Sequence, residues 1–202
     1  MIVHPIGMMR ANAASGVNFN EQWAGYTLGE PLQTEGPYER LSGALNVTTE
    51  DRSGTRVATM LDNTDLTYRY TGPAPTSNRS LTAVIHQESD LAGSYVAFYL
   101  SYIDDNNFIE AKVAQDGWIN LRYLVGGTGV FTAVGLNVGA GAGDTIKLTL
   151  SGTTLTLHHN GGLLSTKTSV PTAPIANHGF RIRAAGAQTT RWEISSLHIE
   201  DL

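Results

Sequence analysis

Residues 94–125 read SYVAFYLSYI, DDNN, FIEAKVA, QDG and WINLRYLV, which is three apolar runs separated by two short polar links. The runs cover residues 94–103, 108–114 and 118–125, and they are rich in β-branched and aromatic residues. Runs of this length between Asp, Asn and Gly turn formers are typical of antiparallel strands joined by tight connections. We therefore predict three consecutive strands of one antiparallel sheet here.

The same pattern continues on both sides of this stretch. Asn160-Gly161 predicts a type I′ turn, because both central residues of that turn need positive φ, which Asn tolerates and Gly permits. Residues 71–79 contain two prolines and a glycine and are predicted to be a loop. Further strands are predicted at residues 41–47, 56–60, 66–70, 80–88, 130–136, 145–150, 153–159, 163–168 and 180–184.

Side-chain alternation indicates how the strands are used. Residues 145–150 alternate Ile and Leu with Thr and Lys, so one face is predicted to be buried and the other wet. In residues 94–103 both the odd-numbered and the even-numbered positions are largely apolar, so we predict that both faces of this strand are buried. Near the C-terminus the apolar parity reverses between Ile194 and Leu197. A bulge around Ser195-Ser196 would restore the inward face.

Composition agrees with an all-β chain and excludes several classes of protein. The chain has 202 residues with 22 glycines, and only 15% of its residues are charged. Thirteen basic residues oppose eighteen acidic ones for a net charge of −5, and the basic ones are scattered, so we expect no nucleic-acid partner. The sequence contains no run of eighteen apolar residues, so we predict no membrane-spanning segment. The absence of cysteine removes disulfides and thiolate chemistry.

The chain divides into an arm, residues 1–16, and one β-domain, residues 17–202. The arm is apolar at first and then small and polar, and His4, Pro5 and Gly7 interrupt it, which argues against a signal peptide. We expect the arm to pack on its own domain or to dock on a neighbouring subunit. The predicted partner-binding residues are Ile2, Val3, His4, Pro5, Ile6, Met8 and Met9.

The order of these elements resembles the concanavalin A-like lectin/glucanase superfamily in its laminin G-like form. The resemblance covers roughly residues 19–202. It implies an antiparallel jelly-roll sandwich of two sheets, found in sugar-binding modules, glycosidases, adhesion domains and phage virion components. The fold does not by itself define the function. The motifs that carry the resemblance are Gly143-Asp144-Thr145, the hairpin at Ser151-Gly152, the turn at Asn160-Gly161, the strand GFRIR at 179–183 and the ending WEISSLHIEDL at 192–202.

Catalysis is not expected from the sequence. Retaining glucanases of this superfamily carry Glu-x-Asp-x-Glu or Glu-x-Asp-x-x-Glu on a strand, where alternate carboxylates share a face. The nearest match, residues 88–93, lacks the final carboxylate. Glu110 and Glu193 stand alone in their predicted strands. Motifs for a nucleophile elbow or a phosphate loop are missing too, so we predict neither an enzyme nor a cofactor.

Metal binding has only weak candidates. Asp104 and Asp105 could contribute oxygen ligands to a calcium site, but Asp and Asn are also standard turn formers, and that interpretation is favoured. His158 and His159 are neighbours on a predicted strand and should point to opposite faces, so a shared metal ion would need a local distortion.

Two functions remain open. The first is a structural assembly protein of a virion, similar to a phage decoration (cement) or tail protein. Its arm and sandwich surface would bind a capsid or tail protein and sister subunits, and we expect a trimer. The second is a carbohydrate-binding, lectin-like module at an extracellular or cell-surface location. Such a module stacks aromatic rings on sugar faces. The aromatic candidates for that role are Trp118, Tyr123 and Tyr102.

Overall fold

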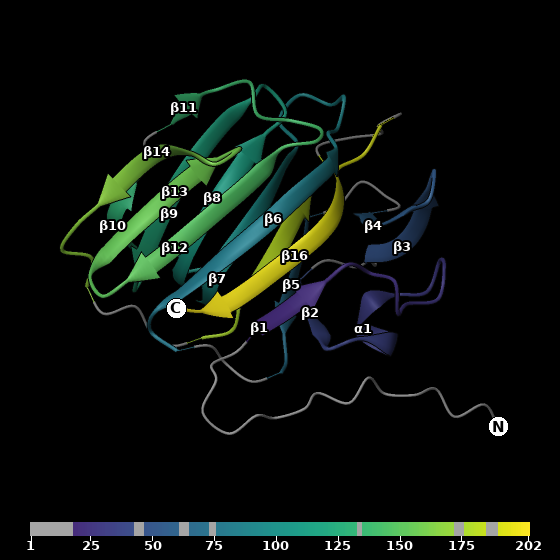
Figure 1. The fold of residues 1–202 in the computed structure, drawn as a ribbon, viewed down its shortest axis with the longest axis horizontal. Coiled ribbons are helices and arrows are strands. Elements are labelled where there is room, and N and C mark those ends of the chain that lie inside the picture. Colours follow the sequence, from purple (N-terminus) through teal and green to yellow (C-terminus); the bar gives the residue numbers. More distant parts are fainter. Residues whose placement is uncertain are drawn as a thin grey trace.

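The computed structural model describes residues 18–42, 47–60, 65–72, 76–132, 135–171, 176–184 and 190–202. Two antiparallel sheets lie face to face as a sandwich, the first in front and the second behind it in Figure 1. The four-residue helix α1 (Leu32–Glu35) precedes β2 and packs beside it. The predicted all-β jelly-roll class is confirmed.

The first sheet has eight strands, and β16 lies near its middle. Both β1 and β4 pair with the same edge of β16, β4 at its start and β1 further along. The spatial order is β14 (Gly162–Lys167), β13 (Thr154–His159), β12 (Thr145–Ser151), β6 (Arg79–Gln87), β16 (Glu193–Asp201), β4 (Thr55–Met60) and β3 (Val47–Arg52), with β1 (Asn18–Glu21) beside β16.

The second sheet also has eight strands and is built around the hairpins of residues 94–125. Its strands β7, β8 and β9 are consecutive in the chain and in space. The spatial order is β10 (Thr128–Thr132), β9 (Trp118–Val125), β8 (Asn107–Ala114), β7 (Tyr95–Asp104), β15 (Gly179–Arg183), β5 (Asp65–Tyr70) and β2 (Tyr38–Ser42), with β11 (Leu136–Asn137) beside β9.

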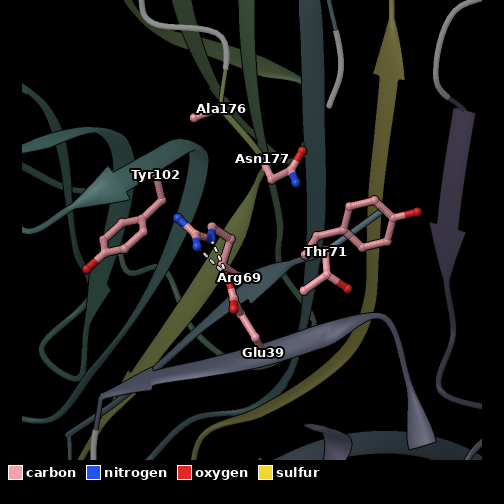
Figure 2. Close-up of a pocket in the computed structure, with 7 residues that line it drawn as sticks. Glu39, Arg69, Thr71, Tyr102, Ala176 and Asn177 are labelled. Atoms are coloured by element: carbon pink, nitrogen blue, oxygen red, sulfur yellow. Dashed lines mark hydrogen bonds and ion pairs between the residues drawn. The ribbon is translucent and has the colours of Figure 1, made fainter. Parts of the chain in front are cut away.

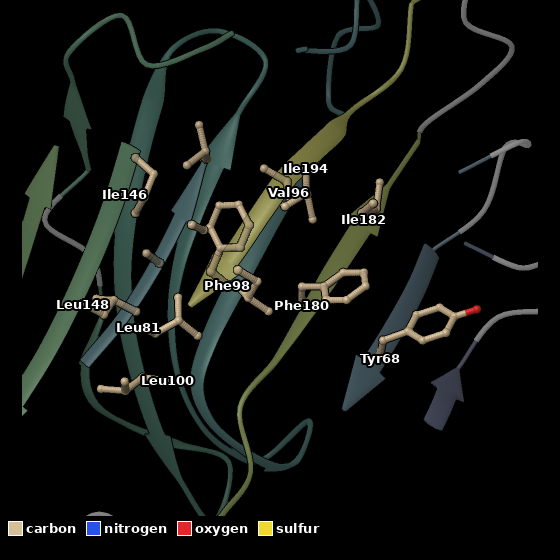
Figure 3. Packing of buried hydrophobic residues seen from close by; sticks show 14 of the residues in the cluster. Tyr68, Leu81, Val96, Phe98, Leu100, Ile146, Leu148, Phe180, Ile182 and Ile194 are labelled. Carbon is tan, nitrogen blue, oxygen red and sulfur yellow. The ribbon is translucent and has the colours of Figure 1, made fainter. Parts of the chain in front are cut away.

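The inward rows of both sheets form one core. Figure 3 shows Leu81 and Ile146 of the first sheet facing Val96, Phe98 and residues of neighbouring strands across the sandwich. Each of these side chains is fully buried. Burying a side chain of this size contributes about 1.5–3 kcal/mol relative to leaving it exposed, so the alternating rows account for the pairing of the two layers.

Aromatic rings fill the end of the core near β2, β5 and β15. Tyr68 stacks on Phe180 with 5.5 Å between ring centroids, and Tyr38 meets Phe180 edge to face. Trp23, which follows β1, packs against the same rings. Large rings fill this wide end of the sandwich and fix where β5 and β15 lie against the first sheet.

Strand β7 is covered on both faces, as predicted. Val96, Phe98 and Leu100 point into the main core, whereas Tyr99 belongs to a second buried cluster on the opposite face. The outer members of that cluster are Ala97, Tyr99, Tyr102 and Phe108, with Tyr95 and Leu124 packed against them.

Two local predictions are confirmed, and a third is tested only at its two ends. The ladder between β16 and β6 shifts register between Ile194 and Ser196, which is the predicted bulge. Asn160 and Gly161 have φ of 50° and 79°, as a type I′ turn requires. The strand predicted at residues 41–47 overlaps the end of β2 in the second sheet and the start of β3 in the first, and its residues 43–46 lie outside the described residues.

Candidate functional site

The outer face of the second sheet, the face turned away from the core, carries a continuous polar row. Strand register brings together one residue from each of six adjacent strands. In spatial order these residues are Glu39, Arg69, Gly179, Tyr99, Glu110 and Arg122. Alternation explains the row, because the neighbouring positions along each strand supply the inward core residues.

Acid–base pairs cover this face. Arg122 Nε donates to Glu110 Oε1 over 2.5 Å, and the Arg181 guanidinium donates to both carboxylate oxygens of Asp65, at 2.5 and 2.7 Å. The second pair has the bidentate geometry that gives arginine–carboxylate contacts their directionality. These pairs hold the charged groups in fixed positions above the aromatic cluster.

Glu110 is the most deeply buried acid of this face, with 1% of its surface exposed. Burial raises the pKa of its carboxyl group, while Arg122 and then Lys112 act in the opposite direction. Burial likewise raises the pKa of Tyr99, and the negative charge of Glu110 adds to that effect. Arg122 is therefore the main group that opposes the rise in the pKa of Glu110.

A pocket of about 380 Å³ opens where this face meets the segment before β15, and we call it the Arg69 pocket. Figure 2 shows the Arg69 side chain reaching between Tyr102 and Glu39. Arg69 Nε donates to Glu39 Oε1 over 2.7 Å, so this cation has a fixed direction. The pocket is lined by Glu39, Arg69, Tyr70, Thr71, Tyr102, Ala176 and Asn177.

Asn177 is held firmly in the pocket wall. Its side-chain Nδ2 donates to Gly72 O over 3.1 Å, and its backbone oxygen accepts a hydrogen bond from Tyr102 N. Its Oδ1 is buried and has no hydrogen-bond partner among the residues that the structure describes. A buried acceptor without a partner is costly for the folded state, so this oxygen lowers the stability of the pocket wall.

Tyr102 forms part of the pocket wall and is largely buried. Its hydroxyl donates to Asp105 Oδ1 over 2.9 Å, and burial followed by that hydrogen bond raises the pKa of the phenol. The pocket thus combines the edge of a tyrosine, a cation and the side chains of Thr71 and Asn177. Groups of these kinds can bind saccharides, whose hydroxyls both donate and accept hydrogen bonds.

The other two aromatic candidates lie elsewhere. Trp118 is 39% exposed on the outer face at the start of β9, and a Cβ at Gly135 would lie 3.1 Å from its ring. Tyr123 is 1% exposed and belongs to the main core, where its hydroxyl points toward Pro171 O. Tyr123 therefore offers no ring face to a ligand.

Asp104 and Asp105 are engaged within the turn and its surroundings. Asp104 Oδ1 accepts hydrogen bonds from Asn107 Nδ2 and Asn106 N, and these two contacts lower its pKa. Asp105 accepts from Tyr102, and Arg181 lies 3.4 Å away. Within the described ranges, no group of three or more His, Asp or Glu residues has the arrangement of a metal site.

The other acidic residues weighed for catalysis are separated in the fold. Glu193 lies on β16 in the first sheet and bonds Arg52 Nε at 2.7 Å, whereas Glu110 lies on β8 in the second sheet. His159 forms a hydrogen bond with Asp144 at 2.7 Å, whereas His158 lies in register with Lys147.

The predicted partner-binding residues of the arm, Ile2 to Met9, lie outside the described residues. No helix in the described segments has the length and hydropathy of a membrane span.

Sequence reasoning missed most of the Arg69 pocket. Arg69 lies at the outward parity of residues 65–70, which is a usable signal. Glu39 lies on β2, outside the predicted strands, and Asn177 lies in the short segment just before β15. The convergence of these segments depends on the order of β2, β5 and β15 in the sheet, which strand periodicity does not encode.

Comparisons with solved structures define the class of the fold. A carbohydrate binding module, CBM66 from Bacillus subtilis, superposes with a TM-score of 0.56 at 10% identity, covering 87% of this chain and 99% of that one. A β-glucanase from Bacillus licheniformis gives 0.61 at 13% identity, with 92% and 98% covered. The exoplasmic/lumenal domain of VIP36, in a form bound to Ca²⁺ and mannose, gives 0.60 at 10% identity, with 83% and 84% covered.

These likenesses establish the concanavalin A-like jelly-roll architecture of lectins and glucanases. No protein-family model matches the sequence. No curated protein matches it either. Because identities of 10–13% reflect the fold alone, the function has to be argued from the site.

Proposed function

We propose that the protein is a non-catalytic saccharide-binding module and that a sugar unit occupies the Arg69 pocket. The observation that carries this proposal is the pocket in which the Arg69 guanidinium lies beside the Tyr102, Thr71 and Asn177 side chains. One sugar hydroxyl can accept a hydrogen bond from Arg69 while a neighbouring hydroxyl bonds the Thr71 hydroxyl. Solved neighbours of the same fold include a carbohydrate binding module and a mannose-bound domain.

The proposal is tested by glycan-array screening followed by calorimetric titration of the best neutral oligosaccharide. Arg69→Ala is expected to weaken binding by about tenfold or more, because a hydrogen bond to a charged donor is lost. Arg183→Ala is the matched control, since Arg183 lies on the same outer face over the Tyr95 ring but away from the pocket. Equal affinity of Arg69→Ala and wild type, or absence of any glycan ligand, would contradict the proposal.

The non-catalytic part of the proposal has its own test. The β-glucanase and the Crh5 transglycosylase share this fold, so the bound oligosaccharide should be incubated with the protein and assayed for new reducing ends and for transfer products. We expect neither product. In support, the outer-face acids Glu110 and Asp65 are each bound to an arginine, which leaves them poorly placed to donate a proton.

An extracellular or cell-surface location fits a saccharide-binding role, and we propose it together with that role. The assembly role expected from the sequence stays a prediction. To distinguish the assembly role from the saccharide-binding role, residues 1–16 are removed and the mass of the protein in solution is measured. A fall from a trimer to a monomer with loss of capsid binding would favour the assembly role, whereas unchanged mass and retained glycan binding would favour the saccharide-binding module.

A further inference from the structure

The outer face of the first sheet holds a second hollow, of about 370 Å³, which we call the Lys147 groove. It extends over β6, β12 and β13, which lie side by side in the front layer of Figure 1. Register places Thr82, Lys147 and His158 in one row across the three strands. The groove is lined by Thr82, Thr145, Lys147, Thr149, Thr156, His158 and Gly161.

The dimensions of the groove follow from strand geometry. Thr145 and Thr149 are four residues apart on β12, which corresponds to about 13 Å, and three neighbouring strands are about 10 Å across. The turn at Gly161 leaves one end open, because a Cβ at that position would meet nothing within 4 Å. This shape suits a short linear oligomer lying along the strands.

The chemistry of the groove favours an anionic, hydroxyl-bearing ligand. Thr82, Thr145, Thr149 and Thr156 line the groove together with Lys147, and His158 lies directly opposite Lys147 on β13. Lys147 therefore brings an ammonium group to the groove and His158 brings an imidazole ring, and the threonine side chains supply hydroxyl and methyl groups beside them.

The cation of the groove is only loosely engaged by its own protein. Lys147 Nζ lies 3.5 Å from Glu200 Oε1, and both side chains are about one-third or more exposed. The same carboxylate oxygen accepts a hydrogen bond from Ser80 Oγ at 2.8 Å, so Glu200 keeps a partner when Lys147 turns away. Long, solvated ion pairs contribute little to stability, so a ligand oxyanion can compete for the ammonium group.

We propose that the Lys147 groove is a binding site for an acidic saccharide, with the carboxylate or sulfate group of the sugar between Lys147 and His158 and its hydroxyls on the threonines. This site lies on the opposite sheet from the Arg69 pocket, and its argument is independent of that pocket.

The test uses calorimetric titration of the full chain with trigalacturonic acid, with galactotriose as the neutral probe and sodium sulfate as the free anion. Wild type is expected to bind trigalacturonic acid at least about tenfold more tightly than either control probe. Lys147→Gln is expected to remove that difference. Lys112→Gln, on the other sheet, is the matched control and should leave it unchanged.

A second variant makes the test independent of simple loss of function. Glu200→Gln removes the competing negative charge but retains an acceptor for Ser80, so it is expected to tighten binding of trigalacturonic acid severalfold. Binding that is equal for the acidic and neutral probes would overturn the proposal, as would equal binding of sulfate alone. Loss of acidic-probe binding in Arg69→Ala with retention in Lys147→Gln would also overturn it, because the ligand would then occupy the other face.

Discussion

His178 is a residue whose burial conflicts with its ability to carry charge. Its side chain is fully buried and stacks on Tyr70 with 4.6 Å between ring centroids. Neither ring nitrogen has a hydrogen-bond partner among the described residues. Burial lowers the pKa of His178 to about 3, and the positive charge of Arg79 acts in the same direction. The folded state therefore holds this imidazole neutral at all but very acidic pH.

The first prediction is that His178 makes the fold sensitive to acid. An unfolded histidine titrates near pH 6.5. Below that pH, His178 therefore binds a proton in the unfolded chain but not in the folded chain. The free energy of unfolding should fall by about 1.6 kcal/mol between pH 6.5 and 5 from this residue alone. Urea unfolding of wild type and His178→Phe at both pH values gives the change in unfolding free energy with pH for each protein.

His198→Asn serves as the control for this prediction, because His198 lies on the outer face and contacts Asn18 at the surface. It should keep the wild-type pH dependence, whereas His178→Phe should show a shallower one. Identical pH dependence in wild type and His178→Phe would show that the buried imidazole is not the group responsible.

At the scale of single elements, the ladder between β15 and β5 depends on Gly179. A Cβ at this position would overlap the carbonyl oxygen of Tyr68 on the neighbouring strand. The backbone of β5 cannot yield easily, because Tyr68 is stacked on Phe180 in the core. The absence of a side chain is therefore a requirement of close strand pairing here.

The second prediction is that Gly179→Ala lowers the free energy of unfolding by about 1–3 kcal/mol, because the extra methyl group forces two paired strands apart. Gly25→Ala is the matched control, since a Cβ there would meet nothing within 4 Å. Thermal or urea unfolding of both variants provides the comparison. Comparable stability of the two variants would argue against tight packing at Gly179.

Strand parity decides how much of the elements and the site the sequence can predict. The reversal between Ile194 and Leu197 is visible in the amino-acid pattern alone, and it correctly predicts the bulge in β16. Parity also distinguishes Trp118, which shares a face with Arg122, from Tyr123, which shares a face with Ile119, whereas aromatic character alone selects both. The predicted candidate Tyr102 does line the pocket. The strand predicted at residues 41–47 spans the end of β2 and the start of β3, and local periodicity does not reveal that these two strands belong to different sheets.

At the scale of the whole molecule, β16 holds the first sheet together. It comes last among the described strands, yet it lies between β6 and β4 and also pairs with β1. Ile194, Leu197 and Ile199 on this strand are fully buried in the main core. Removing them would open the sandwich and leave β6 with an unpaired edge.

The third prediction is that a chain ending at Arg191 shows no cooperative thermal transition in calorimetry, because it lacks a central strand and part of the core. A chain lacking only Leu202 is the control, since that side chain is 59% exposed. The control should unfold as the full chain does. A cooperative transition in the shorter chain would mean that the remaining strands form a stable core without β16.

The late position of β16 in the chain also matters during synthesis on the ribosome. While the preceding strands emerge, the nascent polypeptide displays apolar rows and an open backbone edge on β6 until β16 follows and pairs with it. Contacts between such distant parts of a chain form slowly, and exposed edges invite association between molecules. We expect production of this protein to benefit from slow translation or from chaperones, and peptides copying β16 to act as competitors of folding.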